Sequence, residues 1–562
     1  MRSPFWVLSL LLAIHAGCDS SNQFWQTTND LLPMVKRGDQ VAYMLALDNQ
    51  VACVERNSHT AFLLDPADPS LKPRMVPVGK APIAAVKHNG SNQMLVVSNG
   101  DSGSASVKAI QPQLQIIDAN PGVAPDVRTL AGRFDGLAQS VDGRFVVLYH
   151  SSSTPDASDT GLFNPNEMTI VDFSIPPDPH VPTLPTKSIR SLGGVPSSIE
   201  FSPPYPFKAG SRALAVVMSQ NYVTILDLDH PDRTEISVPL CAQSTGCTFS
   251  PDQIVFDPAN LNIYVRAGSA QDIFQITLTD LWPAVPAAGN PDNDFYASLS
   301  MLSVGANPKG MSLYSDNAGT HLAVLAPGSR RLVIIDPSTS HTQSIATSIP
   351  VDTIVPFTVL DSAGTEKNQA MLVDTLYGGT SVLFADLEQV ATTAGLAISD
   401  SPLRAAAGDV WPLVDDQGKP IAAVLVLGKP TTISAFTVVE FSTRRFVDIT
   451  ASSAFRNPYL ETRNPSRMWG VSSGTMLSYF NLVARSGEAT LAPASIWLDQ
   501  TITSIQALNQ TSTDGHRYLV VEQEYQDTIG NLTFLDADHP DRATARTAYG
   551  FLFSNYLERG QP

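Results

Sequence analysis

A short unit of strands and turns recurs along most of this chain. Its clearest copy runs from Val304 to Asp336, where an alternating run at 309–314 is followed by apolar runs at 321–325 and 332–335. Turns separate these runs, because Ser-Asp-Asn-Ala-Gly at 315–319 and Pro-Gly-Ser at 327–329 are residue types that stabilise or tolerate tight bends. The pattern therefore predicts an antiparallel sheet of short strands.

Looser copies of the unit follow one another at intervals of roughly 40–60 residues, the range of β-propeller blades. Their strand centres are apolar, as in MLVVS at 94–98, FVVLY at 145–149 and YVTILD at 222–227. One such sheet cannot bury both of its faces, so the copies must pack against one another around an axis. We predict an all-β fold, a β-propeller of about seven or eight four-stranded antiparallel blades. The propeller would span 39–562, and a division into subdomains 39–400 and 401–562 stays open because the unit fades after residue 400.

The unit resembles the YVTN type of β-propeller repeat, which is found in surface-layer proteins and surface lipoproteins. That repeat joins a VG-x-x-P-x-G opening, a Ser-x-Asp-x-x-Gly turn and a V-x-V-I-D end. The matching residues are Val304, Gly305, Pro308, Gly310, Ser315, Gly319, Val333, Ile335 and Asp336. The resemblance implies a propeller fold and says little about activity, because propellers host binding, scaffolding and several enzyme chemistries.

The N-terminus has the pattern of an export signal. Arg2 precedes an apolar run from Phe5 to Ile14, which is too short to span a membrane comfortably. The following His-Ala-Gly-Cys resembles a bacterial lipobox, in which a lipid is attached to the cysteine, here Cys18. We predict a signal peptide at 1–17, then the anchor cysteine and a polar tether at 18–38. Secretion after cleavage at Ala16 or Gly17 is the alternative.

The charge of the chain argues against nucleic-acid binding. There are 53 acidic and 35 basic residues, a formal net charge of −18. A nucleic-acid partner needs a basic surface, so we expect no nucleic acid and only a lipid anchor in contact with membrane.

The cysteines fit an oxidising compartment. Cys241 and Cys247 lie close together in CAQSTGC and are predicted to form a disulfide, since their spacing fits neither a CxxC motif nor a zinc site. Cys53 lies in an apolar strand pattern and is predicted to be a buried, inert thiol.

One pentapeptide, DHPDR, occurs twice, each time after a strand that ends in Leu-Asp. One interpretation is a pair of Ca²⁺ loops, since calcium prefers several oxygen ligands. The other is a blade turn, in which Pro fixes φ, Asp caps the bend and Arg pairs with Asp. The candidate metal ligands are Asp227, Asp229, Asp232, Asp536, Asp538 and Asp541.

Two insertions and an apolar segment near the C-terminus depart from the repeated unit. Segments 151–167 and 281–296 are rich in Pro, Gly, Asn and Asp and are expected to be loops on one face. The apolar segment 550–557 is expected to pair with the first sheet and so remove an exposed edge.

No catalytic signature stands out. The chain has no HExxH and no P-loop motif, and no catalytic residue is assigned. We predict an exported, lipid-anchored binding or scaffolding module of the bacterial cell envelope, with an envelope protein or polysaccharide as partner and no cofactor other than the Ca²⁺ considered above. The alternatives are a lactonase-like metal-dependent hydrolase with its site in the axial channel, and a structural surface-layer component.

Overall fold

A computed structural model describes most of the chain after residue 40. The described residues are 41–55, 59–101, 109–151, 164–176, 183–189, 194–241, 249–268, 270–281, 294–388, 398–415, 417–428, 432–461, 466–482, 493–508, 510–525 and 529–552. The predicted signal peptide, Cys18 and the tether lie outside them, as do most of the two insertions.

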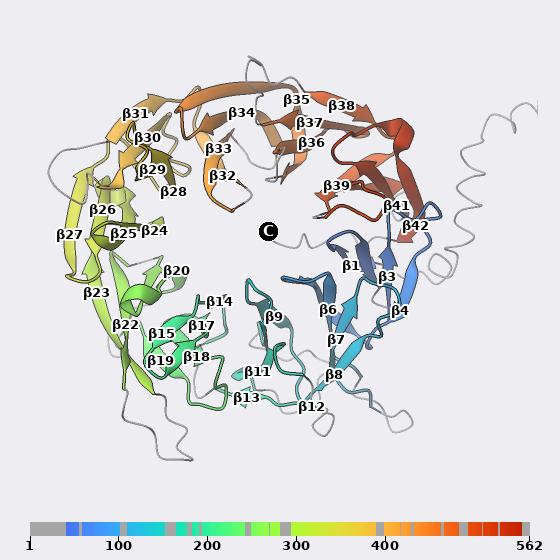
Figure 1. The fold of residues 1–562 in the computed structure, drawn as a ribbon, viewed down its shortest axis with the longest axis horizontal. Helices are drawn as coiled ribbons and strands as arrows, with labels where there is room; N and C mark the ends of the chain where they lie inside the picture. The colour runs from blue at the N-terminus through green and yellow to red at the C-terminus, as the bar shows by residue number, and fades with distance from the viewer. Residues whose placement is uncertain are drawn as a thin grey trace, which may run out of the picture. The chain divides into compact units, whose positions relative to one another are not determined.

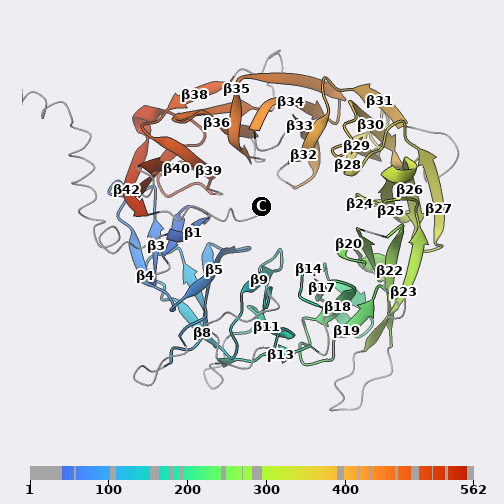
Figure 2. The ribbon, with the colours of Figure 1, turned by 180° about the vertical axis from the view of Figure 1, so that it is seen from behind.

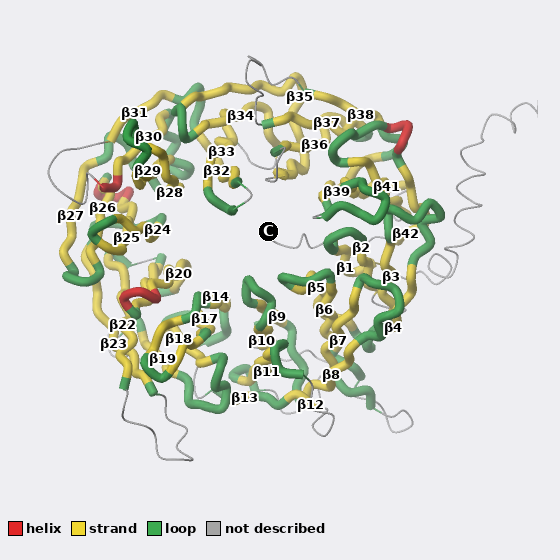
Figure 3. Tube along the Cα trace, in the orientation of Figure 1, coloured by secondary structure: helices red, strands yellow, loops and turns green. Residues whose placement is uncertain are grey.

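Strands dominate the described residues, and the few short helical segments are red in Figure 3. The strands of the first half are β1(Val41–Ala46), β2(Val51–Glu55), β3(Thr60–Leu64), β4(Arg74–Pro77), β5(Pro82–His88), β6(Gln93–Ser98), β7(Gln113–Asp118), β8(Asp126–Leu130), β9(Gly136–Gln139), β10(Phe145–Tyr149), β11(Glu167–Asp172), β12(Thr183–Leu184), β13(Lys187–Ser188), β14(Ser198–Phe201), β15(Tyr205–Phe207), β16(Gly210–Arg212), β17(Leu214–Met218), β18(Tyr222–Asp227), β19(Ile236–Pro239), β20(Pro251–Asp257), β21(Asn262–Ala267), β22(Asp272–Asp280) and β23(Phe295–Ser303). Those of the second half are β24(Met311–Asp316), β25(Gly319–Ala326), β26(Arg331–Asp336), β27(His341–Ala346), β28(Thr353–Leu360), β29(Glu366–Val373), β30(Ser381–Asp386), β31(Ile398–Pro402), β32(Ala407–Val414), β33(Pro420–Leu427), β34(Thr432–Glu440), β35(Arg445–Glu461), β36(Arg467–Ser473), β37(Met476–Asn481), β38(Ala494–Trp497), β39(Thr501–Ala507), β40(Tyr518–Tyr525), β41(Ile529–Asp536) and β42(Arg546–Leu552). The 3-10 segments are η1(Pro258–Asn260), η2(Pro327–Ser329) and η3(Arg542–Thr544).

The chain forms two compact units. Unit 1 contains Met1–Arg128, Ser473–Ser478 and Ser495–Pro562, and unit 2 contains Thr129–Ser472 and Tyr479–Ala494. The boundary at residue 400 considered from the sequence stays a prediction.

Most sheets of unit 2 have four antiparallel strands in the order of the chain. The sheets β20-β21-β22-β23, β24-β25-β26-β27 and β28-β29-β30-β31 are examples. Both ribbon views place these sheets one after another, each with its first strand on the inner side and its last strand on the outer side (Figures 1 and 2). This is the strand order of propeller blades, so the predicted all-β class and the four-stranded antiparallel sheets are confirmed.

Neighbouring sheets share apolar cores. In unit 2, Leu325 and Ile334 of one sheet pack with Leu372 and Leu383 of the next, and all four side chains are buried. Fully burying a side chain of this size contributes about 1.5–3 kcal/mol relative to leaving it exposed. On the other face of the first of these two sheets, Val324 and Val333 pack with Tyr264 of the preceding sheet, so this sheet is apolar on both faces, as a blade between two neighbours requires.

The same packing joins the first and last sheets within unit 1. Cys53 and Phe62 of the sheet β1-β2-β3-β4 lie in one core with Val520 and Phe534 of the sheet β39-β40-β41-β42. The first and the last described sheets thus pack against each other through buried faces.

The clearest sequence unit folds as predicted. The three expected strands are β24, β25 and β26, and the expected turns fall between them. The fourth strand, β27, has the sequence HTQSIA and is mostly exposed, so it had no apolar pattern to reveal it.

The expected role of the C-terminal segment was wrong for its described part. β42 pairs with β41 of its own sheet and not with the first sheet, all four strands of which come from Val41–Pro77. Face-to-face packing, rather than a shared strand, joins these sheets. Among the described residues, no helix is long and apolar enough to cross a membrane.

Candidate functional site

The antiparallel order divides the turns of each sheet between two opposite edges. We call the edge with the first-to-second and third-to-fourth strand turns the AB edge. The BC edge carries the second-to-third strand turn and the link to the next sheet. The DHPDR segments follow third strands and therefore lie at AB edges.

An aspartate ends the third strand in many sheets and shapes the turn that follows. The carboxylates of Asp65, Asp118 and Asp172 each accept the backbone N–H two residues later at 2.8 Å, and Asp336 does so at 2.9 Å. This is an Asx turn, in which a side chain replaces a backbone acceptor. The aspartate at this position thus has a structural task in several sheets.

The same turn leads into both DHPDR segments, and it begins at the aspartate that ends the preceding strand. Asp227 Oδ1 accepts the N–H groups of Asp229 and His230, each at 3.1 Å. Asp536 Oδ1 accepts those of Asp538 at 2.8 Å and His539 at 3.1 Å. Asp227 and Asp536 therefore already accept hydrogen bonds from the backbone.

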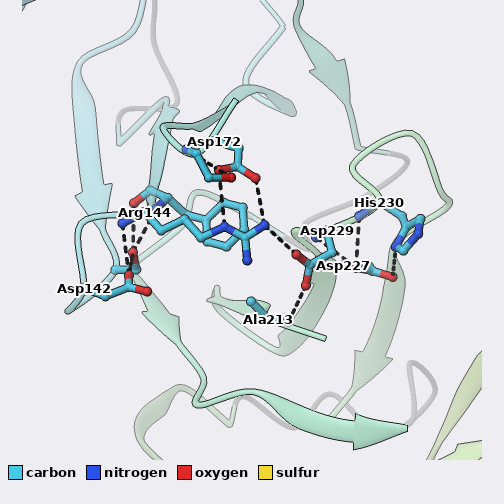
Figure 4. Close-up of polar contacts among 10 residues, drawn as sticks. Asp142, Arg144, Asp172, Ala213, Asp227, Asp229 and His230 are labelled. Atoms are coloured by element: carbon cyan, nitrogen blue, oxygen red, sulfur yellow. Dashed lines mark hydrogen bonds and ion pairs between the residues drawn. The ribbon is translucent and has the colours of Figure 1, made fainter. Parts of the chain in front are cut away.

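Arg144 links the first DHPDR segment to the preceding sheet (Figure 4). Its Nη2 lies 2.9 Å from Asp172 Oδ2 and 2.8 Å from Asp229 Oδ1. The other oxygen of Asp229 accepts the N–H of Ala213 at 2.7 Å. Burial alone would raise the pKa of Asp172, but bonds from Arg144 and Ser174 outweigh it and hold that pKa below its usual value. The guanidinium thus joins the β10–β11 sheet to the β17–β18 sheet.

Asp227 lies deeper and faces a histidine and two arginines. Its Oδ2 is 3.3 Å from His230 Nδ1, 3.5 Å from Arg233 Nη1 and 3.6 Å from Arg212 Nε. Burial is the largest influence and raises the pKa of Asp227 above its usual value, although the neighbouring side chains oppose it.

Asp294, directly before β23, completes this cluster. It lies 2.8 Å from Arg233 Nη1 and 3.1 Å from Arg212 Nη2. Burial would raise the pKa of Asp294, but the two arginines outweigh it and lower that pKa. The cluster therefore connects a third sheet, through residues that the sequence analysis did not single out.

The candidate ligands of the first segment accordingly face guanidinium groups or solvent. Asp227 and Asp229 are directed at arginines, whereas Asp232 is exposed. Arg212 and Asp294 are 82 positions apart in the chain, so no local pattern could have paired them.

In the second DHPDR segment the candidate metal ligands also contact nearby side chains or the backbone. Asp536 Oδ2 lies 2.7 Å from His516 Nδ1, and Asp538 Oδ1 lies 2.7 Å from Arg517 Nη2. The Asp541 carboxylate caps η3 by accepting the N–H of Ala543 at 3.0 Å. Within the described ranges, no group of three or more His, Cys, Asp or Glu is placed to hold a metal ion. The calcium and hydrolase interpretations stay predictions.

The cysteines agree with the predictions as far as the described residues reach. Cys53 is a buried free thiol, and burial, assisted by the carboxylates of Glu522 and Glu55, raises its pKa. Cys241 is disulfide-bonded, and Cys247 lies outside the described residues, so the pairing itself stays a prediction.

The most distinctive feature of a BC edge is the loop 374–380 between β29 and β30, which we call the 374–380 loop. Asp352 Oδ2 accepts the N–H groups of Thr375 at 2.9 Å and Leu376 at 3.0 Å. Asp352 Oδ1 accepts the hydroxyls of Thr375 at 2.7 Å and Thr353 at 2.8 Å. A single buried carboxylate thus fixes the start of the loop.

A second buried carboxylate fixes the remainder of this loop. Asp374 accepts the N–H groups of Leu376 at 3.1 Å, Tyr377 at 2.6 Å and Gly379 at 2.7 Å. Gly379 leaves the necessary room, because a Cβ there would lie 2.7 Å from Asp374 Oδ2. The backbone of the loop is therefore held in one conformation from within.

This rigid backbone presents apolar side chains outward. Leu376 is 64% exposed and Tyr377 is 48% exposed. The Tyr377 hydroxyl accepts a hydrogen bond from Asn307 Nδ2 at 2.8 Å, which ties it to the link before β24. Large exposed apolar residues that are held in place are typical of contact sites for a partner.

Comparisons with known proteins give distant structural similarities. No protein-family model matches the chain, and no curated protein matches it. The dihydro-heme d1 dehydrogenase NirN is 12% identical over 91% of this chain and 76% of its own, with a TM-score of 0.36. AztD from Citrobacter koseri is 12% identical over 65% of this chain and 86% of its own, with a TM-score of 0.30. The extracellular domain of BT4673 from B. thetaiotaomicron is 12% identical over 90% of this chain and 66% of its own, with a TM-score of 0.25. Similarities this distant carry no argument about activity, and the resemblance to the YVTN repeat stays a prediction.

Proposed function

We propose that the chain is an exported binding module of the bacterial cell envelope, and that the 374–380 loop is its contact site. The observation that carries this proposal is the pair of buried carboxylates, Asp352 and Asp374, under an exposed Leu376 and Tyr377. Ordering a loop costs conformational entropy. Side chains that stay exposed bury little apolar surface, so they contribute little free energy of folding to offset that cost. A partner that covers Leu376 and Tyr377 would bind more tightly to an ordered loop than to a flexible one, because less conformational entropy is lost on association.

A protein is the partner that this chemistry favours. An aliphatic side chain beside an aromatic one fits an apolar pocket on another protein, where such anchors contribute most of the binding energy. A polysaccharide partner is the second outcome that the test below distinguishes.

The architecture proposed for this module is a closed β-propeller of about seven or eight blades of the YVTN type. The shared core of the first and last sheets supports closure. The anchor would be a lipid on Cys18, and replacing Cys18 by Ser is expected to move the chain from the membrane fraction to the aqueous fraction after cell lysis. Equal membrane retention of both forms would contradict lipid anchoring.

The test of binding is site-specific photocrosslinking on intact cells. A photoreactive amino acid replaces Leu376 in one variant, and in the control it replaces Val141, which is 90% exposed on an AB edge. We expect a discrete higher-mass adduct at position 376 and none at 141. A protein in the adduct supports the favoured partner, and a glycan adduct would support the polysaccharide. No adduct at 376, or the same adducts at both positions, would refute the proposed site.

A further inference from the structure

The outer strand β23 is long and uncharged, whereas the outer strands β27 and β38, which also have no Asp, Glu, Lys, Arg or Pro, are shorter and have the sequences HTQSIA and ASIW. β23 has the sequence FYASLSMLS, nine residues without a charge or a proline. Four further outer strands carry residues that commonly protect a sheet edge from pairing with another chain. These are Arg74 and Pro77 in β4, Pro239 in β19, Asp400 and Pro402 in β31, and Arg546 in β42.

The hydrogen bonds between β22 and β23 show which backbone groups of β23 point away from β22. The strand pairs with β22 along its whole length, from Asp280 opposite Phe295 to Asp272 opposite Ser303. Directly beyond this register, Leu281 N donates to Asp294 O at 2.8 Å. Hydrogen-bonded pairs alternate with non-bonded pairs in an antiparallel ladder. The backbone groups of Ala297, Leu299 and Met301 therefore point away from β22.

No described segment pairs with that outer edge of β23. The side chains beside it are also accessible, since Met301 is 63% exposed, Tyr296 is 47% exposed and Leu299 is 38% exposed. An accessible edge with apolar side chains and no charge is suited to pairing with another strand.

The sequence of β23 is complementary to itself when two copies run antiparallel. A two-fold axis at Leu299 pairs all nine residues. Leu299 then faces Leu299, Ala297 faces Met301 and Ser298 faces Ser300, so like meets like in the central five residues. The end pair differs, because Phe295 faces Ser303. In this register the outward-facing groups of Ala297, Leu299 and Met301 form the hydrogen-bonded pairs.

The net charge of the chain opposes contact between two copies over most of the surface, and the uncharged strand β23 is an exception. The chain carries a net charge of −18, so two copies repel each other over most of their surfaces. β23 places no like charges opposite each other in the self-paired register.

We infer that β23 is a homodimerisation edge, through which two copies of this chain join their sheets by antiparallel strand pairing about a two-fold axis at Leu299. A closed two-fold contact of this kind uses the same surface on both copies. The contact is one strand wide, so the dimer forms reversibly and depends on concentration. The inference is independent of the 374–380 loop and of its partner.

The test is sedimentation equilibrium of the full exported chain with Cys18 replaced by Ser. The average mass of this reference protein should rise toward that of a dimer as its concentration increases. Leu299→Lys places two lysines opposite each other on the axis and should raise the dissociation constant about tenfold or more. Leu360→Lys is the matched control, because Leu360 is 69% exposed on another strand, and it should dimerise like the reference.

A second variant keeps the test decisive if Leu299→Lys fails to fold. Leu299→Pro removes an N–H that faces away from β22, a change that an edge strand tolerates, and it should also weaken the dimer. A reference protein that stays monomeric at every concentration would overturn the inference. Dimerisation of both Leu299 variants as tight as that of the reference would overturn it too, by placing the contact elsewhere.

Discussion

Replacing Asp352 by alanine tests whether buried carboxylates hold the 374–380 loop. The Asp352 carboxylate accepts four hydrogen bonds, but their loss is not equally costly. Leu376 N keeps a partner in Asp374 Oδ1, and the two threonine hydroxyls can rotate toward other acceptors. The N–H of Thr375 is the group that loses its acceptor.

The expected cost follows from that single group. An unsatisfied backbone N–H in a partly buried loop costs about 1–3 kcal/mol, and the lost bond was to a charged acceptor. We therefore expect Asp352→Ala to lower the free energy of unfolding by about 2–3 kcal/mol. Asp352→Asn is the matched control, because its amide oxygen can accept both N–H groups while its NH₂ donates to the hydroxyls of Thr353 and Thr375. It should cost about 1 kcal/mol or less.

Two measurements check this expectation. Urea unfolding gives the change in stability, and amide hydrogen exchange reports whether protection of Thr375 and Leu376 is lost while that of β25 is kept. The reasoning fails if Asp352→Ala is nearly neutral with an intact loop. It also fails if Asp352→Asn is as damaging as Asp352→Ala, since charge rather than hydrogen-bond geometry would then be responsible.

Three further predictions concern the AB edges and the cysteines. Arg144→Gln should lower stability by about 1 kcal/mol near neutral pH, since the Arg144 side chain is partly exposed. The pKa of Asp172 lies below its ordinary value, so the stabilisation is complete above that ordinary value and is lost as pH falls through the lower, folded-state value. The difference in stability between Arg144→Gln and the unchanged chain in urea titrations should therefore shrink in acid. Arg404→Gln, whose partner is the neutral Thr450 hydroxyl, should show no such trend. Adding Ca²⁺ after chelation should leave the unfolding midpoint unchanged, because Asp227 and Asp229 already pair with arginines; an increase that disappears in Asp229→Asn and Asp538→Asn would support the calcium interpretation instead. With Cys18 replaced by Ser, a thiol reagent counted by mass spectrometry should modify no cysteine of the folded chain, Cys53 alone after unfolding, and Cys241 and Cys247 as well only after reduction; modification of Cys247 without reductant would contradict the predicted disulfide.

The sequence determined the local elements, because strands and turns depend on neighbouring residues. The alternation and the turn residues of 304–336 predicted β24, β25 and β26, and their apolar centres placed them in the core. The same reasoning missed β27, since an exposed outer strand has no apolar pattern. For the aspartates before and within the DHPDR segments it left a calcium loop and a blade turn open, and Asp227 and Asp536 form Asx turns.

Only the tertiary structure decided which distant groups meet. Arg144 and Asp229 are 85 positions apart, and Arg212 and Asp294 are 82 apart, so nothing local pairs them. The 374–380 loop depends on Asp352, which belongs to the link before β28 and lies 23 positions before Thr375. Packing of sheet against sheet brings such groups together, and burial then strengthens their attraction and makes an unpaired partner costly. Sequence periodicity therefore predicted the strands, whereas the ion pairs, the ordered loop and the accessible edge of β23 followed from how the sheets stack.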